Sequence, residues 1–437
     1  MRASLLALAA VLLAEALGVS HGNLSRTALV LVLLGVVAVA LAVASPGQGR
    51  PPWAEVALGA GIAAGFAYNA LFQPGWHATH ALMPAFRPVL ALAAVLAATY
   101  AWTDAPPVLR RARPLALAAL WLVLVALVFR AYPAPRIDVW DLQQGAVAGL
   151  LRGQDPYALA YPNTYGPGTS LLSPRVLSPD GAEILGFPYP PLAILAGVPG
   201  FALLGDVRWS HAALTLAAAA GIWLLGRRGR TAELAALLVL FQPNGFFLVE
   251  QAWTEPVVLA CLVGLALALQ RRPESVWPGV AAGLALAAKQ YTPLLLVPLL
   301  AAEPPRARLR GAAVAAAVAA VIYVPFAVCD PAAFWHSLVE FQLAQPFRSD
   351  SLSASALLFR RLGVQLPDWF GFAAAGAVVA LGWRRAREPA GALAVAALAW
   401  LVLILLAKQA FANYYGLAVG MLAAGVAAVP PPRPDGL

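Results

Sequence analysis

The sequence has few charged residues for its length. Only 11% of its 437 residues are Asp, Glu, Lys or Arg, whereas 61% are hydrophobic. Soluble globular proteins carry about a quarter charged residues, and one chain of this length cannot enclose so much apolar surface in water. The composition therefore excludes a soluble enzyme, a nucleic-acid-binding domain and a disordered scaffold. It predicts an integral membrane protein with many spans.

Sequence signals for metals and for familiar catalytic motifs are also sparse. The two cysteines, Cys261 and Cys329, give neither a disulfide framework nor zinc-ligand spacing. The chain contains no P-loop, nucleophile-elbow or HExxH pattern. His77 and His80 are three residues apart, but no third ligand is nearby in the sequence. The sequence therefore assigns no cofactor, and it favours a metal-independent protein.

Apolar stretches near the ~20 residues that cross a bilayer recur along the whole chain. We expect helices at 4–20, 27–45, 53–71, 86–102, 114–131, 207–226, 231–249, 255–270, 309–328, 367–383, 390–407 and 411–429. A further apolar stretch, 277–302, is interrupted by Lys289 and Pro293 and predicts either one kinked span or two short helices. The fold class is thus an all-α polytopic membrane protein of about 12–14 transmembrane helices.

The basic residues indicate the orientation of these spans. Lys and Arg total 29 for a net charge of +9, and the arginines gather in short segments between apolar runs, which is typical of cytoplasmic loops. The segments are 110–113, 227–230, 271–272, 306–310 and 384–387. All of them lie on one side, with both termini cytoplasmic, if 277–302 is a hairpin and 189–205 does not cross. Should 189–205 cross, two of the segments would lie outside.

Two long loops then lie on the outer face, at about 132–206 and 329–366. In the first loop, apolar residues recur at helical spacing from Val139 to Leu150, which predicts an amphipathic helix along the membrane surface. Asp138 stands at the junction between the preceding span and this helix. A partly desolvated carboxylate there suits a general base acting on an alcohol. The alternative is that Asp138 only caps the helix.

Lys289 and Lys408 are the only lysines, and both lie inside apolar runs. Ionisable groups at membrane depth are costly and usually line an interior cavity, where an ammonium group suits a phosphate. The alternative is that the side chains extend to the membrane interface, which we favour for Lys408. Polar residues also gather at 250–255, at 345–353 and at 413–415, all on the expected outer face.

An ordered series of motifs over about residues 113–430 carries a family resemblance. The series reads IDVW, GQDPY, FPYPPLAIL, EQAWTEP, GLALAAKQYTPLLLVP, FRSDSLSASALL and FANYY. It resembles the GT-C membrane glycosyltransferases, specifically the polyprenyl-phosphate-mannose-dependent enzymes of glycosyltransferase family 87. The resemblance implies a GT-C-like bundle with two long outer loops that carry juxtamembrane helices.

The resemblance also implies roles for individual residues. Asp138 would be the catalytic base, and Lys289 and Arg348 would hold the donor phosphate. Glu255 falls near a second acidic position of the family, where Asp was expected. The substrate-binding candidates are Asp141, Tyr157, Tyr189, Gln251, Glu255, Asn413 and Tyr414.

The function expected from this resemblance is an inverting glycosyltransferase at the outer face of the cell membrane. It would move a sugar, expected to be mannose, from a polyprenyl-phosphate donor to a glycolipid or glycan, with no nucleic-acid partner. Residues 1–105 would be accessory membrane helices, and 106–437 the catalytic membrane domain. The alternative is a transporter or flippase, although the two halves of the chain lack the repeat symmetry common in transporters.

Overall fold

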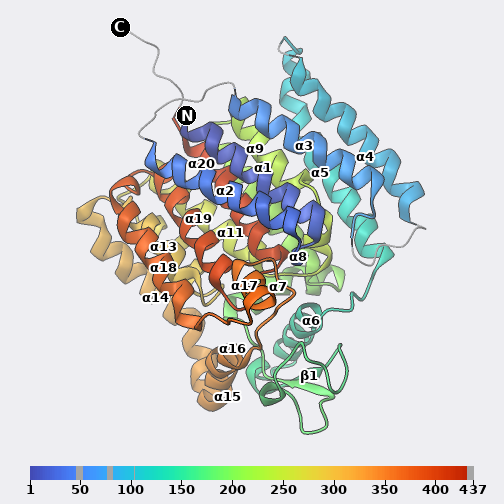
Figure 1. The fold of residues 1–437 in the computed structure, drawn as a ribbon, viewed down its shortest axis with the longest axis vertical. Coiled ribbons are helices and arrows are strands. Elements are labelled where there is room, and N and C mark those ends of the chain that lie inside the picture. The colour runs from blue at the N-terminus through green and yellow to red at the C-terminus, as the bar shows by residue number, and fades with distance from the viewer. Residues whose placement is uncertain (46–52, 76–81, 103, 431–437) are drawn as a thin grey trace.

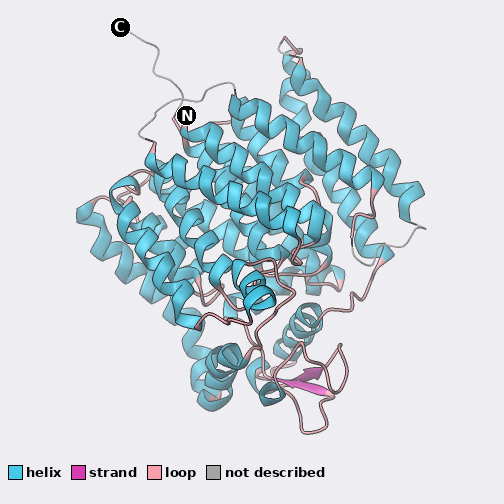
Figure 2. Ribbon diagram, in the orientation of Figure 1, coloured by secondary structure: helices cyan, strands magenta, loops and turns pink. Residues whose placement is uncertain are grey.

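The computed structural model describes residues 1–45, 53–75, 82–102 and 104–430, and these residues are almost entirely helical (Figure 2). Seven of the described helices are long and apolar enough to cross a membrane. They are α1 (Arg2–Ser20), α2 (Arg26–Ala44), α3 (Trp53–Leu71), α4 (Met83–Ala98) with the 3-10 turn that extends it to Ala101, α5 (Pro107–Ala131), α14 (Pro305–Cys329) and α19 (Pro389–Leu406). The chain is therefore a polytopic, all-α membrane protein.

Further helices complete the bundle. They are α8 (Arg208–Leu225), α9 (Arg230–Phe241), α10 (Gly245–Glu250), α11 (Glu255–Arg271), α18 (Asp368–Gly382) and α20 (Ala412–Ala428). By length and composition, the described helices supply seven spans, or eight if the bent pair Pro191–Leu204 and Arg208–Leu225 is one span. The expected number of about 12–14 is approached only when these further helices are added, and α10, with 6 residues, is too short to cross a bilayer. Almost every residue of α9, α19 and α20 is buried, so these three helices form the centre of the bundle.

Small residues let the helix backbones approach closely in the absence of water. A Cβ on Gly65 of α3 would lie 1.8 Å from the carbonyl oxygen of Phe241 in α9. A Cβ on Gly226, after α8, would lie 2.2 Å from the side chain of Ala232. The Ala- and Gly-rich composition is thus used for close packing between neighbouring helices.

Ion pairs and hydrogen bonds of basic residues tie the helix ends together at one end of the bundle. Arg2 bonds Glu388, at 2.6 Å, so α1 begins beside the start of α19. The other contacts of this kind are Arg113–Glu233, Arg230–Glu55 and Arg271 to the carbonyl oxygen of Leu224. Figure 1 shows this end at the top, whereas α6 (Asp138–Leu151), β1 (Ala160–Pro162), α15 (Pro331–Trp335) and α16 (Phe341–Ala344) gather at the opposite end. We call the opposite end the loop end.

The stretch 189–205 forms α7 (Pro191–Leu204), which is bent by 114° from α8. At its start, the backbone N–H of Leu192 donates to the carbonyl oxygen of Ala287, at 3.0 Å. Just after its end, the carbonyl oxygen of Gly205 accepts from Gln144 of α6, at 3.0 Å. Both contacts are with elements of the loop end, so α7 folds along that end and does not continue through the bundle.

The stretch 277–302 forms two helices of 10 residues each, α12 (Trp277–Leu286) and α13 (Thr292–Ala301). Gly279, near the start of α12, packs so closely on α14 that a Cβ would lie 2.6 Å from the carbonyl oxygen of Gly311. A Cβ on Gly311 would in turn lie 2.7 Å from the carboxylate of Glu303, which follows α13. The start of α12 and the end of α13 therefore both lie beside Gly311 of α14. The stretch is a hairpin, and Lys289 lies at its tip.

The first long loop begins with α6 (Asp138–Leu151) and contains strands β1 (Ala160–Pro162) and β2 (Glu183–Leu185). The strands pair antiparallel, with Tyr161 opposite Ile184, over a small core of their own. The second loop contains α15 (Pro331–Trp335), a π-helical turn at His336–Glu340, α16 (Phe341–Ala344) and α17 (Ala354–Leu362). The expected juxtamembrane helices are therefore present in both loops.

The first helices of the chain share the main core. Buried residues of α1 and α2 belong to the same hydrophobic cluster as those of α19 and α20. The turn between α1 and α2 also pairs with the second long loop, through a bridge between Asn23 and Ser351. The division at residue 105 into accessory and catalytic parts stays a prediction, but α1 and α2 are packed into the part that follows it.

Candidate functional site

A cavity of about 630 Å³ opens at the loop end. Its walls include the α1–α2 turn, the α5–α6 junction, part of the first long loop, the tip of the α12–α13 hairpin, the second long loop and adjoining parts of α18, α19 and α20. Seven of the residues expected from the sequence line it: Asp138, Tyr189, Gln251, Lys289, Arg348, Asn413 and Tyr414. Asp141, Tyr157 and Glu255 are not among its lining residues.

Asp138 is the first residue of α6 and faces the cavity. Its Oδ1 accepts hydrogen bonds from the backbone N–H of Val139, at 2.8 Å, and from the hydroxyl of Tyr165, at 2.9 Å. Burial raises the pKa of this carboxyl, an effect that the two hydrogen bonds and the charge of Arg348 oppose. A carboxylate at a helix N-terminus also gains from the helix dipole. Asp138 is thus ionisable, oriented and accessible from the cavity.

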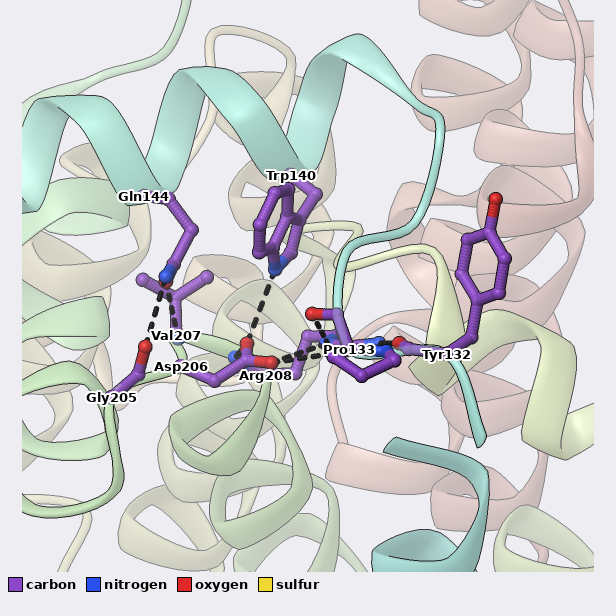
Figure 3. Close-up of polar contacts among 8 residues, drawn as sticks. All are labelled: Tyr132, Pro133, Trp140, Gln144, Gly205, Asp206, Val207 and Arg208. Atoms are coloured by element: carbon purple, nitrogen blue, oxygen red, sulfur yellow. Dashed lines mark hydrogen bonds and ion pairs between the residues drawn. The ribbon is translucent and has the colours of Figure 1, made fainter. Parts of the chain in front are cut away.

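A buried arginine holds α6 in place. Arg208, at the start of α8, donates to the carbonyl oxygens of Tyr132 and Pro133, both at 2.9 Å. It also pairs with Asp206, at 2.5 Å. Asp206 in turn accepts from the indole N–H of Trp140 on α6, at 3.3 Å. Figure 3 shows the side chains of Trp140 and Gln144 pointing from α6 toward the turn that precedes α8. The Arg208 contacts therefore join the end of α5, the start of α8 and α6.

A second buried group supports the inner face of α6. The amide of Gln143 donates to the carbonyl oxygen of Ala252, at 2.5 Å, and its oxygen lies 2.7 Å from Nε2 of His211. All three residues are fully buried. Unpaired polar groups are costly at this depth, so these bonds favour one position of α6 relative to α8 and the α10–α11 turn. The position of Asp138 follows from that of α6.

Two of the candidates have structural roles in the first loop. Asp141 is one helical turn after Asp138 and accepts from the hydroxyl of Thr164. Tyr157 is buried among aromatic rings, and its hydroxyl donates to the carbonyl oxygen of Tyr189, at 2.9 Å. Asp141 and Tyr157 fold the loop, and Tyr157 supports the cavity residue Tyr189 from behind.

Lys289 is already paired at the hairpin tip. Its Nζ lies 3.3 Å from Oε1 of Glu255 and 2.5 Å from the hydroxyl of Thr254. It also lies 4.2 Å from the centre of the Tyr189 ring. Glu255 accepts a further bond from the hydroxyl of Tyr291, at 3.1 Å. Glu255 and Lys289 therefore form a buried ion pair at the cavity wall, in which Lys289 lines the cavity and its ammonium group is largely occupied by Glu255.

Two other cations line the cavity with more exposed partners. Arg348 forms a two-pronged pair with Asp350, at 2.9 and 2.6 Å. Lys408 lies 3.3 Å from Asp368 and donates to the carbonyl oxygens of Gln342 and Leu343. The Asp350 and Asp368 side chains are 42% and 55% exposed. Carboxylates so exposed are held weakly, so an incoming phosphate can compete with them.

Arg136, Tyr165 and Lys408 are among the cavity residues to which sequence reasoning assigned no site role. Arg136 lines the cavity, is exposed, and has no ion pair with any residue that the structure describes. Its position two residues before Asp138 was a signal that we did not use. Tyr165 orients Asp138 across 27 residues of sequence, and no local pattern marks it. Lys408 was expected to reach the membrane interface, yet it lines the cavity.

Metal ligands do not cluster in the described part of the chain. Among the described residues, no group of three or more His, Cys, Asp or Glu side chains is arranged to hold a metal ion. His77 and His80 lie outside the described residues. The expectation that no metal is needed stays a prediction.

These features define a class: an almost entirely helical, polytopic membrane protein with a cavity at one end of its bundle, lined by a half-buried carboxylate and several cations. The family model of glycosyltransferase family 87 matches residues 187–408, about half of the chain. The chain belongs to this glycosyltransferase family. The resemblance expected from the ordered motifs is thereby confirmed, as is the all-α membrane fold.

Structural comparison finds one similar solved structure: ArnT from Cupriavidus metallidurans, crystallised with undecaprenyl phosphate. The two are 17% identical with a TM-score of 0.45, over 71% of this chain and 59% of that one. This chain thus spans about three fifths of the length of that protein. A search of curated proteins gave no match.

Proposed function

We propose that the protein is an inverting glycosyltransferase. It takes a sugar, with mannose as the first candidate, from a polyprenyl-phosphate donor and transfers it to a hydroxyl of a glycolipid or glycan. The observation that carries this proposal is the position of Asp138, an oriented carboxylate on the wall of a cavity in a family 87 protein. The name of the similar structure, ArnT with undecaprenyl phosphate bound, agrees with a lipid-phosphate donor.

In this mechanism Asp138 is the general base. The carboxylate accepts the proton of the acceptor hydroxyl as the oxygen attacks the anomeric carbon of the donor sugar. The bond between that carbon and the phosphate oxygen breaks on the opposite face, so the configuration inverts. The bond electrons leave with the polyprenyl phosphate, which gains one negative charge. The Tyr165 hydroxyl holds the carboxylate in position.

The developing charge on the leaving phosphate needs cations close by. Arg348 and Lys408 suit this role, because both line the cavity and their carboxylate partners are exposed. Arg136 adds a third positive charge at the cavity wall. Lys289, the other phosphate ligand expected from the sequence, lines the same cavity, but its ammonium pairs with Glu255. We therefore give the larger share of phosphate binding to Arg348 and Lys408.

The polyprenyl chain needs an apolar route between cavity and bilayer. Phe372 of α18 and Leu403 and Ile404 of α19 line the cavity, and Phe372 is 57% exposed. Apolar side chains that line a cavity and remain exposed suit contact with a lipid tail. We place the tail along this α18–α19 wall. By the positive-inside rule, the arginine-rich end is cytoplasmic and the cavity faces outward.

Membranes that contain the protein, supplied with radiolabelled polyprenyl-phosphate-mannose, test the proposal. We expect a new labelled glycolipid or glycan with the wild-type chain and none with Asp138→Asn present at the same level. Donor consumption without any labelled product, or equal product from both chains, would contradict the transferase assignment. Donor moved across the membrane without chemical change would favour a flippase instead.

A further inference from the structure

The turn between α1 and α2 reaches the cavity. His21 and Asn23 both line it, although they lie more than 100 residues before Asp138 and outside the family match at 187–408. Sequence reasoning treated this part of the chain as accessory. Because the turn forms part of the cavity wall, it can contact a ligand that binds in the cavity.

Backbone hydrogen bonds join this turn to the second long loop. The N–H of Leu24 donates to the carbonyl oxygen of Asp350, at 2.7 Å, and the N–H of Leu352 donates to that of Gly22, at 3.1 Å. Asn23 and Ser351 stand opposite each other in this short antiparallel bridge. Asp350 is the partner of Arg348. The turn is therefore attached to the segment that carries a proposed phosphate ligand.

The same turn also packs against the segment that follows α19. Gly22 has a φ of +81°, and a Cβ there would lie 2.3 Å from the backbone nitrogen of Ala412. The N–H of Leu352 also lies 3.0 Å from the carbonyl oxygen of Ala410, and that of Arg348 2.9 Å from the carbonyl oxygen of Lys408. Three distant segments thus form one backbone unit at the cavity, and the first helical hairpin contributes one of them.

Asn23 presents a neutral amide to this cavity. Its side chain is exposed, and its Nδ2 donates to the carbonyl oxygen of Ser20, at 3.3 Å. The amide oxygen accepts no hydrogen bond from the residues that the structure describes. His21 beside it is held by Tyr68, at 3.3 Å, and by an edge contact with Phe247. A neutral amide donates and accepts equally well, which suits a hydroxyl more than a phosphate.

We propose that the α1–α2 turn is a carbohydrate-binding wall of the cavity, in which Asn23 hydrogen-bonds hydroxyl groups of a substrate sugar. The sugar belongs either to the lipid-linked donor or to the acceptor, and both offer the same chemistry. This proposal rests on the proposed function for the nature of the ligand. It makes the first helical hairpin part of the binding site.

Kinetics of the full chain test the proposal. Loss of one neutral hydrogen bond should raise a KM roughly two- to ten-fold, so we expect this of Asn23→Ala with little change in kcat. Ser25→Ala is the matched control, because Ser25 belongs to the same turn but does not line the cavity. A raised donor KM would assign the contact to the donor sugar, and a raised acceptor KM to the acceptor. Unchanged values for both would overturn the proposal.

A binding measurement separates this proposal from the proposed function, because it needs no turnover. Asn23→Cys is combined with Cys261→Ala and Cys329→Ala, and the introduced thiol is labelled with a maleimide. We expect slower labelling with polyprenyl-phosphate-mannose or a soluble oligomannoside than with polyprenyl phosphate alone. Equal labelling in all three conditions, while the wild-type chain transfers sugar, would overturn this inference alone. Failure of the proposed function would instead appear as absent transfer by the wild-type chain.

Discussion

At the scale of single residues, the environment of each carboxylate separates two acids that look alike in the sequence. Asp138 and Asp141 are three residues apart on α6, and both carboxyl groups have pKa values raised by burial. Only Asp138 lines the cavity, whereas Asp141 accepts from Thr164 within the first loop. The structure thereby distinguishes a residue that can meet substrate from one that folds the loop.

The first prediction follows from this difference. Asp138→Asn keeps the shape of the side chain but cannot accept a proton, so turnover should fall by about 10²–10⁴-fold. Asp141→Asn should keep most activity. Sugar transfer is measured in membranes with matched protein levels. A dead Asp141→Asn beside an active Asp138→Asn would mean that the base has been assigned to the wrong carboxylate.

The second prediction concerns pH. The base must be ionised, so activity should fall as the pH drops toward the pKa of Asp138, which burial raises. Tyr165 donates to the carboxylate and thus lowers this pKa. Tyr165→Phe removes that bond, raises the pKa further, and should move the acidic limb of the rate profile to higher pH. A limb that stays in place, measured from turnover against pH, would remove Asp138 or Tyr165 from this role.

At the scale of elements, buried polar contacts set the positions of the helices that carry the site. The side chain of Arg208 is fully buried, and it joins α5, α6 and α8 through two carbonyl groups and Asp206 (Figure 3). The hairpin of α12 and α13 carries Lys289, which Glu255 neutralises from α11. The Arg208–Asp206 and Lys289–Glu255 pairs neutralise charges that would be costly if they were left unpaired in the interior.

Removal of the Arg208 guanidinium should therefore destabilise the fold. Arg208→Gln removes the cation that pairs with Asp206 and the donor to two carbonyl oxygens, and the loss of one partner of a buried pair costs about 3–5 kcal/mol. We expect a lower melting temperature in detergent. Arg152→Gln, on an exposed arginine just after α6, is the control and should melt like the wild type. Equal melting temperatures for the two variants would argue against a positioning role for Arg208.

The two lysines should differ in their effects. Lys408→Ala removes a proposed contact to the donor phosphate, and a charge-assisted bond is worth about 1.5–3 kcal/mol, so the donor KM should rise roughly ten- to a hundred-fold. Lys289→Ala leaves Glu255 buried without its partner and should chiefly lower thermal stability. Donor titrations and melting curves of both variants measure this. A large KM effect for Lys289→Ala alone would restore Lys289 as the main phosphate ligand.

At the scale of the whole molecule, the bundle has two chemically different ends. One end carries the short arginine-rich turns, joined by pairs such as Arg2–Glu388 and Arg113–Glu233, whereas the other carries both long loops and the cavity. Figure 1 shows the two ends on opposite sides of the helix bundle. This asymmetry agrees with the positive-inside rule and supports the proposal that the cavity faces outward.

Thiol labelling tests the orientation in intact cells. In a chain with Cys261→Ala and Cys329→Ala, an impermeant reagent should label Asp180→Cys, which replaces an exposed residue of the first loop. Glu274→Cys, an exposed position in the turn after α11, should react only after the membrane is opened. The reverse pattern would place the cavity on the cytoplasmic side.

Local patterns in the sequence were enough for the class of protein, most helices, both long loops and the family. The length of an apolar run and the position of an arginine cluster reflect whether a segment lies in the bilayer or in water. Both can be read from residues that are neighbours in the sequence. Asp138 was recognisable because it stands at the exit of a predicted span. The motif order was sufficient for family 87 because it extends along three quarters of the chain.

The tertiary structure alone decided which polar groups meet. Lys289 pairs with Glu255 across 34 positions, Tyr165 orients Asp138 across 27 residues, and the α1–α2 turn joins a loop more than 300 residues away. Such pairs form only when helices pack, and the cost of unpaired polar groups in an apolar interior then selects among them. No local pattern records these partners, so the cavity wall formed by His21 and Asn23 was invisible in the sequence.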